Sequence, residues 1–233
     1  MGAGYTGLYI ASKLLENNHK VLVIESEPGL THEKYYSGIN GNKVRISKRF
    51  WHYVDDLGLN IIDEDEYGFW VRPLDVIVLL ASKVISLGGE IIVDSIIEPT
   101  YKIMDDRIII IGASVRSVED EGGLDKFYIL TRGIIDTSPS AIIVNNLIDR
   151  LKLGIPIQGA GPQIPGSDDV IGKTTWIFPG ILVAGLAAIY TNAGYIPFPD
   201  IGPLFGSGYR AVELFVKGYP KNPEDFYSFP SII

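Results

Sequence analysis

Three glycines near the start of the chain have the spacing of a loop that holds a dinucleotide. Gly2, Gly4 and Gly7 form Gly-x-Gly-x-x-Gly and lead into an expected helix at residues 5–15. In such a loop the first glycine allows a tight turn, the second lets a diphosphate approach the backbone, and the third lets the helix pack closely. The free N–H groups at the helix start favour phosphate. These residues therefore predict a diphosphate-binding loop.

An acidic residue follows at the distance that a ribose-binding carboxylate requires. The apolar run at residues 20–25 is typical of a buried parallel strand and ends in Glu25, 23 residues after Gly2. Its carboxylate would accept hydrogen bonds from the adenosine ribose. Only Met1 precedes Gly2, although this fingerprint normally follows a buried central strand. We therefore expect the natural chain to begin upstream, with this start a truncation or a misplaced initiation site.

The apolar pattern of the 233 residues predicts one α/β domain, a Rossmann-type FAD/NAD(P)-binding fold with an inserted β-rich segment and a truncated first strand. Further helices are expected at residues 47–57, 74–87, 141–151 and 208–216. Further strands are expected at residues 67–71, 90–93, 107–111, 126–130, 133–136 and 181–184. Residues 217–233 contain three prolines and are expected to form an extended tail.

Composition narrows the classes of partner and chemistry. The net charge of −8 and pI near 4.9 disfavour nucleic acid and anionic membranes and leave a small-molecule nucleotide as the expected partner. The absence of cysteine excludes disulfides, zinc–thiolate sites, iron–sulfur clusters and a cysteine nucleophile. The apolar stretch at residues 176–198 is interrupted by prolines and predicts a buried strand and turn, not a membrane span. A cytoplasmic location is expected.

Together with motifs farther along, these residues resemble the thiamine thiazole synthases, which are similar in fold to FAD/NAD-type Rossmann proteins. The most specific segment is Ile201-Gly-Pro-Leu-Phe-Gly206, because such a loop before a final helix is uncommon in Rossmann proteins. The other matching segments are Gly41-Asn42-Lys43 and residues 69–71, 80–83, 134–136, 179–187 and 207–213, together with Asp125.

The resemblance implies that the chain binds NAD or an ADP-thiazole product. Gly2, Gly4 and Gly7 would hold the diphosphate and Glu25 the ribose. Backbone near Ile97 and Asp136 would enclose adenine and the second ribose, with Gly202 also at the cofactor site. The implied activity is that of a transferase: NAD loses nicotinamide, its ribose joins glycine, and a sulfur source completes the thiazole of thiamine. Members without a sulfur-donating cysteine use sulfide and ferrous iron, and a homo-oligomer is expected.

Two positions at the reacting end depart from the family pattern. Asp125 stands where one iron ligand belongs, but Ser140 stands fifteen residues later in place of histidine, and a neutral hydroxyl is a poor ferrous ligand. Asp200 occupies the position of an arginine that would hold the glycine carboxylate, and an acid repels that anion. Asp125, Ser140 and Asp200 are therefore the candidate catalytic residues, with Asp125 the candidate metal ligand, and the predicted nucleotide site is better supported than the chemistry.

Two other functions stay open. The first is an FAD-dependent oxidoreductase, against which Leu186 counts, because such proteins usually carry an aspartate after the glycine at position 185. The second is a catalytically silent nucleotide-binding subunit that pairs with an active paralogue, as the losses at positions 140 and 200 would predict. His19, His32 and His52 have no ligand-like spacing.

Overall fold

The computed structural model describes residues 2–30, 43–104, 107–119 and 126–219. The helices are α1 (Tyr5–Glu16), the 3-10 helix η1 (Lys48–Phe50), α2 (Trp51–Leu57), α3 (Pro73–Ser86), α4 (Ile142–Leu151), α5 (Asp169–Gly172), α6 (Leu186–Asn192) and α7 (Gly202–Lys217). The strands are β1 (Leu22–Ile24), β2 (Val44–Ser47), β3 (Ile61–Glu64), β4 (Gly68–Val71), β5 (Glu90–Ile92), β6 (Ser95–Met104), β7 (Arg107–Ser117), β8 (Phe127–Leu130), β9 (Ile134–Asp136), β10 (Thr175–Phe178) and β11 (Ile181–Val183).

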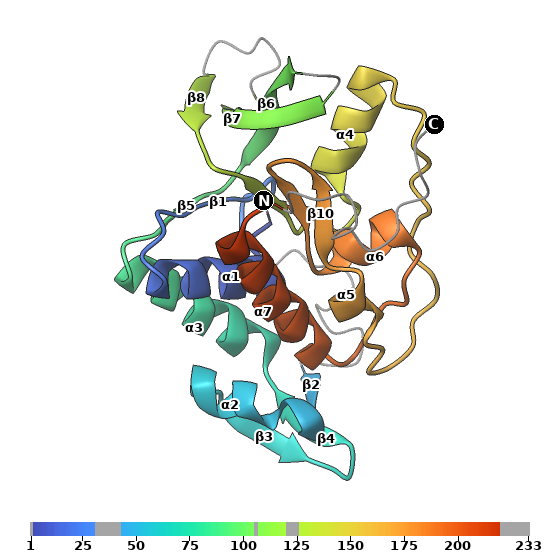
Figure 1. Cartoon of the computed structure of the whole chain (residues 1–233). Coiled ribbons are helices and arrows are strands. Elements are labelled where there is room, and N and C mark those ends of the chain that lie inside the picture. The colour runs from blue at the N-terminus through green and yellow to red at the C-terminus, as the bar shows by residue number, and fades with distance from the viewer. Residues whose placement is uncertain (1, 31–42, 105–106, 120–125, 220–233) are drawn as a thin grey trace.

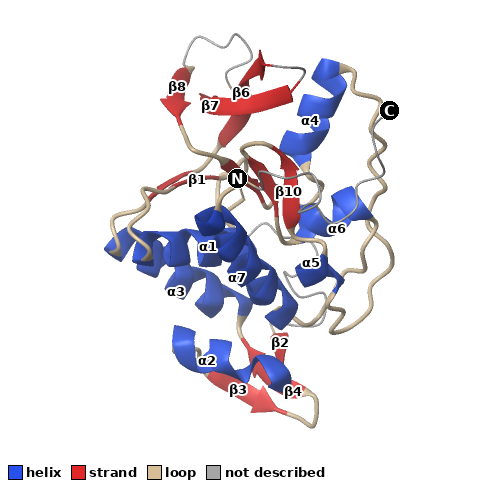
Figure 2. Ribbon diagram, viewed as in Figure 1, coloured by secondary structure: helices blue, strands red, loops and turns tan. Residues whose placement is uncertain are grey.

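The middle of the molecule holds two small pieces of parallel sheet. In the first, β1 pairs with β5, with Leu22 opposite Glu90. In the second, β9 pairs in parallel with β11, and β11 pairs antiparallel with β10. Helices α1, α3 and α7 lie on one side of this layer, and the β6–β7–β8 sheet lies on the other (Figure 1, Figure 2). The predicted α/β class is confirmed.

Two antiparallel sheets complete the fold, one at each end of the view in Figure 1. One has the order β6–β7–β8, which is the β-rich segment that the sequence predicts. The other has the order β2–β4–β3. Strands β2, β3, β6 and β10 were not predicted, because such strands are stabilised by side-chain partners on neighbouring strands, and these partners leave little local signal in the sequence. The helix expected at residues 47–57 is present as η1 and α2, and the structure corrects only its first residue, since Ser47 ends β2.

The closing helix α7 begins at Gly202, six residues earlier than the expected start at position 208. Pro203 lies in its first turn, where a missing backbone N–H costs nothing, so the proline permits this earlier start. Gly208 lies in the middle of the helix at its contact with α1, and a Cβ there would lie 2.7 Å from the ring of Tyr9. The glycine that seemed to start the helix instead allows α7 to pack closely on α1.

The core beside these helices contains three rings. The centroid of the Tyr9 ring lies 5.6 Å from that of Tyr53 and 5.4 Å from that of Phe205. All three side chains are buried. Burial raises the pKa of Tyr53 to about 12 and that of Tyr9 well above its ordinary range. The described helices include none that combines the length and apolar character needed to cross a membrane.

Candidate nucleotide-binding site

The glycine loop lies between the carboxyl ends of β1 and β9, at the start of α1. The amide of Gly2 donates to the carbonyl of Ile24 at 2.8 Å, and Gly2 has a φ of +101°, which favours glycine. Gly4 is the N-cap of α1 and provides no side-chain cap. A Cβ on Gly7 would collide with the carbonyl oxygen of Gly2. The glycines at positions 2 and 7 therefore keep the loop folded tightly over the helix start.

Glu25 directly follows β1 and reaches this loop. Its Oε2 accepts the amide of Ala3 at 2.6 Å, while its Oε1 accepts the Ser26 hydroxyl at 3.3 Å and the Glu27 amide at 3.2 Å. These bonds hold a partly buried carboxylate beside the glycine loop. Ligands of open parallel sheets bind outside the carboxyl ends of the strands, which is where this carboxylate lies. The structure thus brings together Gly2, Gly7 and Glu25, which the spacing predicted to act together.

Thr137 is a member of this cluster that sequence reasoning missed. Its hydroxyl donates to the carbonyl of Gly2 at 3.3 Å, and a Cβ on Gly2 would lie 2.8 Å from that hydroxyl oxygen. The available signal was its position, because Thr137 directly follows the predicted strand that ends in Asp136. A residue at the carboxyl end of a parallel strand lies at the edge where the glycine loop must also lie.

Asp136 itself directs its carboxylate into the protein. Its Oδ1 accepts the amide and the hydroxyl of Ser138 at 3.0 and 2.7 Å, and its Oδ2 accepts the amides of Ile143 and Val144 at 3.0 and 3.3 Å. The side chain is fully buried and holds the first turn of α4. Ile97 lies on β6, is buried, and lines the same cavity as Gly2. The side chain of Ile97 therefore faces the cavity beside the glycine loop, whereas the side chain of Asp136 does not.

The start of α7 also approaches the glycine loop. The hydroxyl of Thr6 donates to the carbonyl of Leu204 at 3.4 Å. Gly185, at the start of α6, is packed so closely that a Cβ there would lie 2.6 Å from the Thr6 hydroxyl, and its amide donates to Ser207 at 2.7 Å. The amino ends of α1 and α7 therefore lie near one another, and their positive dipole ends favour a bound anion.

Asp200 and Gly202 form a second cluster, with β2. Asp200 is fully buried, and its Oδ1 accepts the amides of Ser47 and Gly202 at 3.2 and 3.0 Å. Its Oδ2 is buried without a hydrogen-bond partner in the described part of the chain, as are the hydroxyl of Ser47 and the Nε of Arg45. The carboxylate thus joins β2 to the start of α7, a link between positions 153 residues apart.

Of the predicted site residues, those of the metal site are the least well defined by the structure. Asp125 lies outside the described residues, and Ser140 lies in the turn before α4, where its carbonyl accepts the side-chain amide of Asn145 at 2.6 Å. The described ranges contain no group of three or more histidine, aspartate or glutamate side chains that could hold a metal. The ring of His19 packs on Phe215 and that of His52 on Tyr53, while position 32 lies outside the described ranges.

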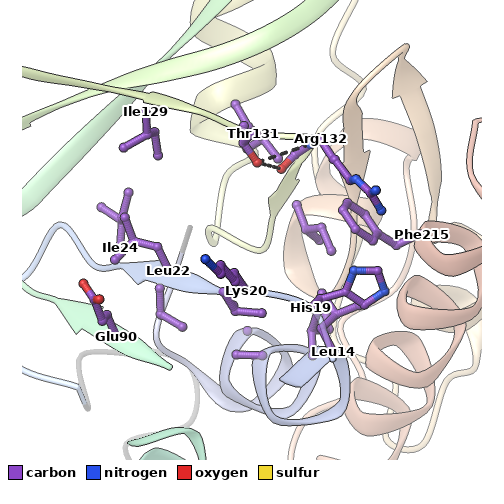
Figure 3. A pocket seen from close by; sticks show the side chains of 18 of the residues that line it. Leu14, His19, Lys20, Leu22, Ile24, Glu90, Ile129, Thr131, Arg132 and Phe215 are labelled. Atoms are coloured by element: carbon purple, nitrogen blue, oxygen red, sulfur yellow. Dashed lines mark hydrogen bonds between the residues drawn. The ribbon is translucent and has the colours of Figure 1, made fainter. Parts of the chain in front are cut away.

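A cavity of about 630 Å³ opens beside the glycine loop and continues between β1 and β9 (Figure 3). Gly2 and Gly7 line it where the loop lies, and Ile97 lines it from the side of β6. His19, Lys20 and Arg132 line it near the amino end of β1. The nucleotide loop and this cavity therefore share one wall.

Comparison with known proteins shows similarity along nearly the whole chain. No family model matches the chain. The thiamine thiazole synthase of Pyrococcus horikoshii is 29% identical over 225 residues, which cover 93% of this chain and 87% of that protein. The thiamine thiazole synthase of Methanococcus maripaludis strain C7 is 25% identical and covers 93% of this chain and 85% of its own.

A solved structure has the same fold. The crystal structure of Thermovibrio ammonificans THI4 superimposes with a TM-score of 0.83 at 20% identity, and the match covers 91% of this chain and 85% of that one. The chain is thus a distant relative of the thiamine thiazole synthases by sequence similarity across nearly its full length, and it shares the fold of one solved member.

Proposed function

We propose that this protein binds NAD, or an ADP-containing thiazole derived from it, in a role like that of the thiamine thiazole synthases. The observation that carries the proposal is the contact between Glu25 and the glycine loop, in which the carboxylate accepts the amide of Ala3 at 2.6 Å. A carboxylate held at the carboxyl end of a parallel strand offers acceptors to ribose hydroxyls, and the helix start beside it offers backbone N–H donors to a diphosphate. The named activity of the related proteins supports the choice of nucleotide.

Each part of the nucleotide has a proposed partner. Gly2, Gly4 and Gly7 approach the diphosphate through backbone, because no side chain intervenes. Glu25 accepts the hydroxyls of the adenosine ribose, exchanging its bond to the Ala3 amide for one to the ligand. Ile97 offers an apolar surface to adenine. Backbone near Asp136 and at Gly202 would complete the enclosure.

Nucleotide binding can be tested by isothermal titration of the protein with NAD and ADP. Glu25→Gln should weaken binding at least tenfold, which corresponds to about 1.4 kcal/mol, because a neutral amide is a poorer acceptor for ribose hydroxyls. The matched control is Glu213→Gln, the same chemical change at an exposed position of α7, and it should bind like the parent chain. Equal affinities of the two variants would contradict the assigned role of Glu25.

Thiazole formation can be tested separately, in a single assay of the purified protein with all the substrates. The buried Asp200 carboxylate repels a substrate carboxylate, and Ser140 is a poor ferrous ligand, so NAD, glycine, sulfide and ferrous iron should give no adenylated thiazole. Formation of that product would show that the chemistry is retained without the arginine and histidine.

A flavin absorption band in the purified protein would favour the oxidoreductase alternative. Native mass spectrometry would reveal a homo-oligomer or an active paralogue.

A further inference from the structure

Three polar atoms gather beside the start of α7, each buried without a hydrogen-bond partner among the described residues. They are Oδ2 of Asp200, the hydroxyl oxygen of Ser47 and Nε of Arg45. Asp200 itself is completely buried. Buried polar atoms in folded proteins nearly always have a partner, because an unpaired one keeps the full cost of leaving water. Three such atoms in one place therefore indicate a site built to receive a polar ligand.

Backbone pairing brings the three side chains together. Arg45 lies opposite Asp200 in a parallel bridge, in which its amide donates to the carbonyl of Pro199 at 2.9 Å. Its carbonyl accepts the amide of Ile201 at 2.8 Å. Side chains alternate along a strand, so Ser47, two residues after Arg45, lies on the same face of β2. All three side chains thus belong to one polar cluster between β2 and α7.

The carboxylate of Asp200 is held in one orientation. Its Oδ1 accepts the amides of Ser47 and Gly202 at 3.2 and 3.0 Å, which leaves Oδ2 for a further donor. Gly166 lies next to Oδ2, and a Cβ built there would lie 3.5 Å from this oxygen, an ordinary contact distance. Because Gly166 has no side chain, an atom of about the size of a carbon fits beside Oδ2.

A guanidinium borders this space without filling it. Nη2 of Arg49 would lie 3.9 Å from the Cβ built on Gly166. The guanidinium instead donates to the carboxylate of Asp168 at 2.6 Å and to the carbonyl of Gly166. Arg49 is therefore held by other acceptors, and Oδ2 of Asp200 can accept a hydrogen bond from a ligand.

The pattern of donors and acceptors selects the chemical class of that ligand. Oδ2 of Asp200 only accepts, Nε of Arg45 only donates, and the hydroxyl of Ser47 can donate. A primary carboxamide is complementary to all three, because its NH₂ group donates and its oxygen has two lone pairs that accept. A carboxylate has no donor for Asp200 and is repelled by it. An ammonium group has no acceptor for the other two.

The start of α7 connects this cluster to the glycine loop. The hydroxyl of Thr6, within the loop, donates to the carbonyl of Leu204 at 3.4 Å, and Gly202 lies only about 3 Å before Leu204 along the helix axis. Glu25 reaches the loop from β1 and is the proposed partner of the adenosine ribose. The other half of a dinucleotide extends from the diphosphate away from Glu25, and the cluster offers it a polar end point.

We propose that Asp200, Ser47 and Arg45 bind the carboxamide at the nicotinamide end of NAD. The NH₂ group donates to Oδ2 of Asp200, and the carbonyl oxygen accepts from the hydroxyl of Ser47 and from Nε of Arg45. This inference rests on the proposed nucleotide-binding function and adds to it a preference for a neutral carboxamide over a carboxylate.

Isothermal titration with NAD, nicotinic acid adenine dinucleotide and ADP tests the preference in the unmodified protein. The first two ligands differ only in a carboxamide against a carboxylate, and NAD should bind at least tenfold more tightly. Equal affinity for these two, with ADP also bound, would overturn this inference and leave the proposed function in place. If none of the three binds, the proposed function fails as well.

Asp200→Asn should change the preference without removing the nucleotide site. Because two backbone amides keep an acceptor at the Oδ1 position, the new NH₂ group takes the place of Oδ2 and turns an acceptor into a donor. The affinity ratio of NAD to nicotinic acid adenine dinucleotide should fall at least tenfold, while ADP affinity stays within about twofold.

The matched control is Asp168→Asn, which removes one negative charge at an exposed position beside Arg49 and should keep the parent ratio. An unchanged ratio in Asp200→Asn, or the same fall in both variants, would overturn the proposal.

Discussion

Substituting Asp136 tests how the structure holds α4 against the central strands. In Asp136→Asn one carboxylate oxygen becomes an NH₂ group, which cannot accept, so two of the four donors that now bond to the side chain lose their acceptor. Each hydrogen bond to a charged group is worth about 1.5–3 kcal/mol, and the site is fully buried. We therefore expect the free energy of unfolding to fall by roughly 3–5 kcal/mol.

The measurement is urea unfolding monitored by circular dichroism, with hydrogen exchange at Ile143 and Val144 as a local readout. The matched control is Asp149→Asn, the same chemical change at an exposed position near the carboxyl end of α4. There a negative charge opposes the helix dipole, so the control should be neutral or slightly stabilising. If the two variants lose equal stability, or if the amides of Ile143 and Val144 keep their protection in Asp136→Asn, Asp136 does not cap the helix.

Three further predictions concern the glycine loop, the second buried acid and the tyrosine core. Gly7→Ala should lower NAD affinity at least tenfold in a titration, because the added methyl collides with the Gly2 carbonyl, whereas Gly172→Ala, where the methyl meets open space, should bind normally. Asp200→Ala removes the acceptor of two buried amides and should cost about 2–4 kcal/mol in thermal unfolding, and an unchanged melting temperature would refute this. Burial raises the pKa of Tyr53 to about 12, so its neutral form stabilises the fold fully below pH 10, and this contribution is lost as the pH rises toward 12. Tyr53→Phe should therefore move the alkaline unfolding midpoint to higher pH, as followed by circular dichroism.

The sequence predicted the elements that carry their own periodicity. The expected helix at residues 74–87 is α3 at Pro73–Ser86, and the expected helix at residues 141–151 is α4 at Ile142–Leu151. Their buried side chains recur at helical spacing, so the signal is local. The glycine loop and Glu25 were predicted for a related reason, since the order helix, strand, acid alone brings them to one sheet edge.

The tertiary structure decided which polar groups work together. Thr137 meets Gly2 across 135 positions, and Asp200 meets Ser47 across 153. No periodicity in the sequence reports contacts of that kind, because they depend on how distant elements pack. The same holds for β2 and β6, whose partners lie on other strands.

The sequence by itself thus determined the α/β class, the glycine loop and its acid, because period and spacing are properties of neighbouring residues. Only the tertiary structure decided that Asp136 caps a helix, that Asp200 joins β2 to α7, and that a cavity lies between β1 and β9. Each of these depends on whether a buried polar group or sheet edge finds a partner, and that is settled only when the whole chain has packed.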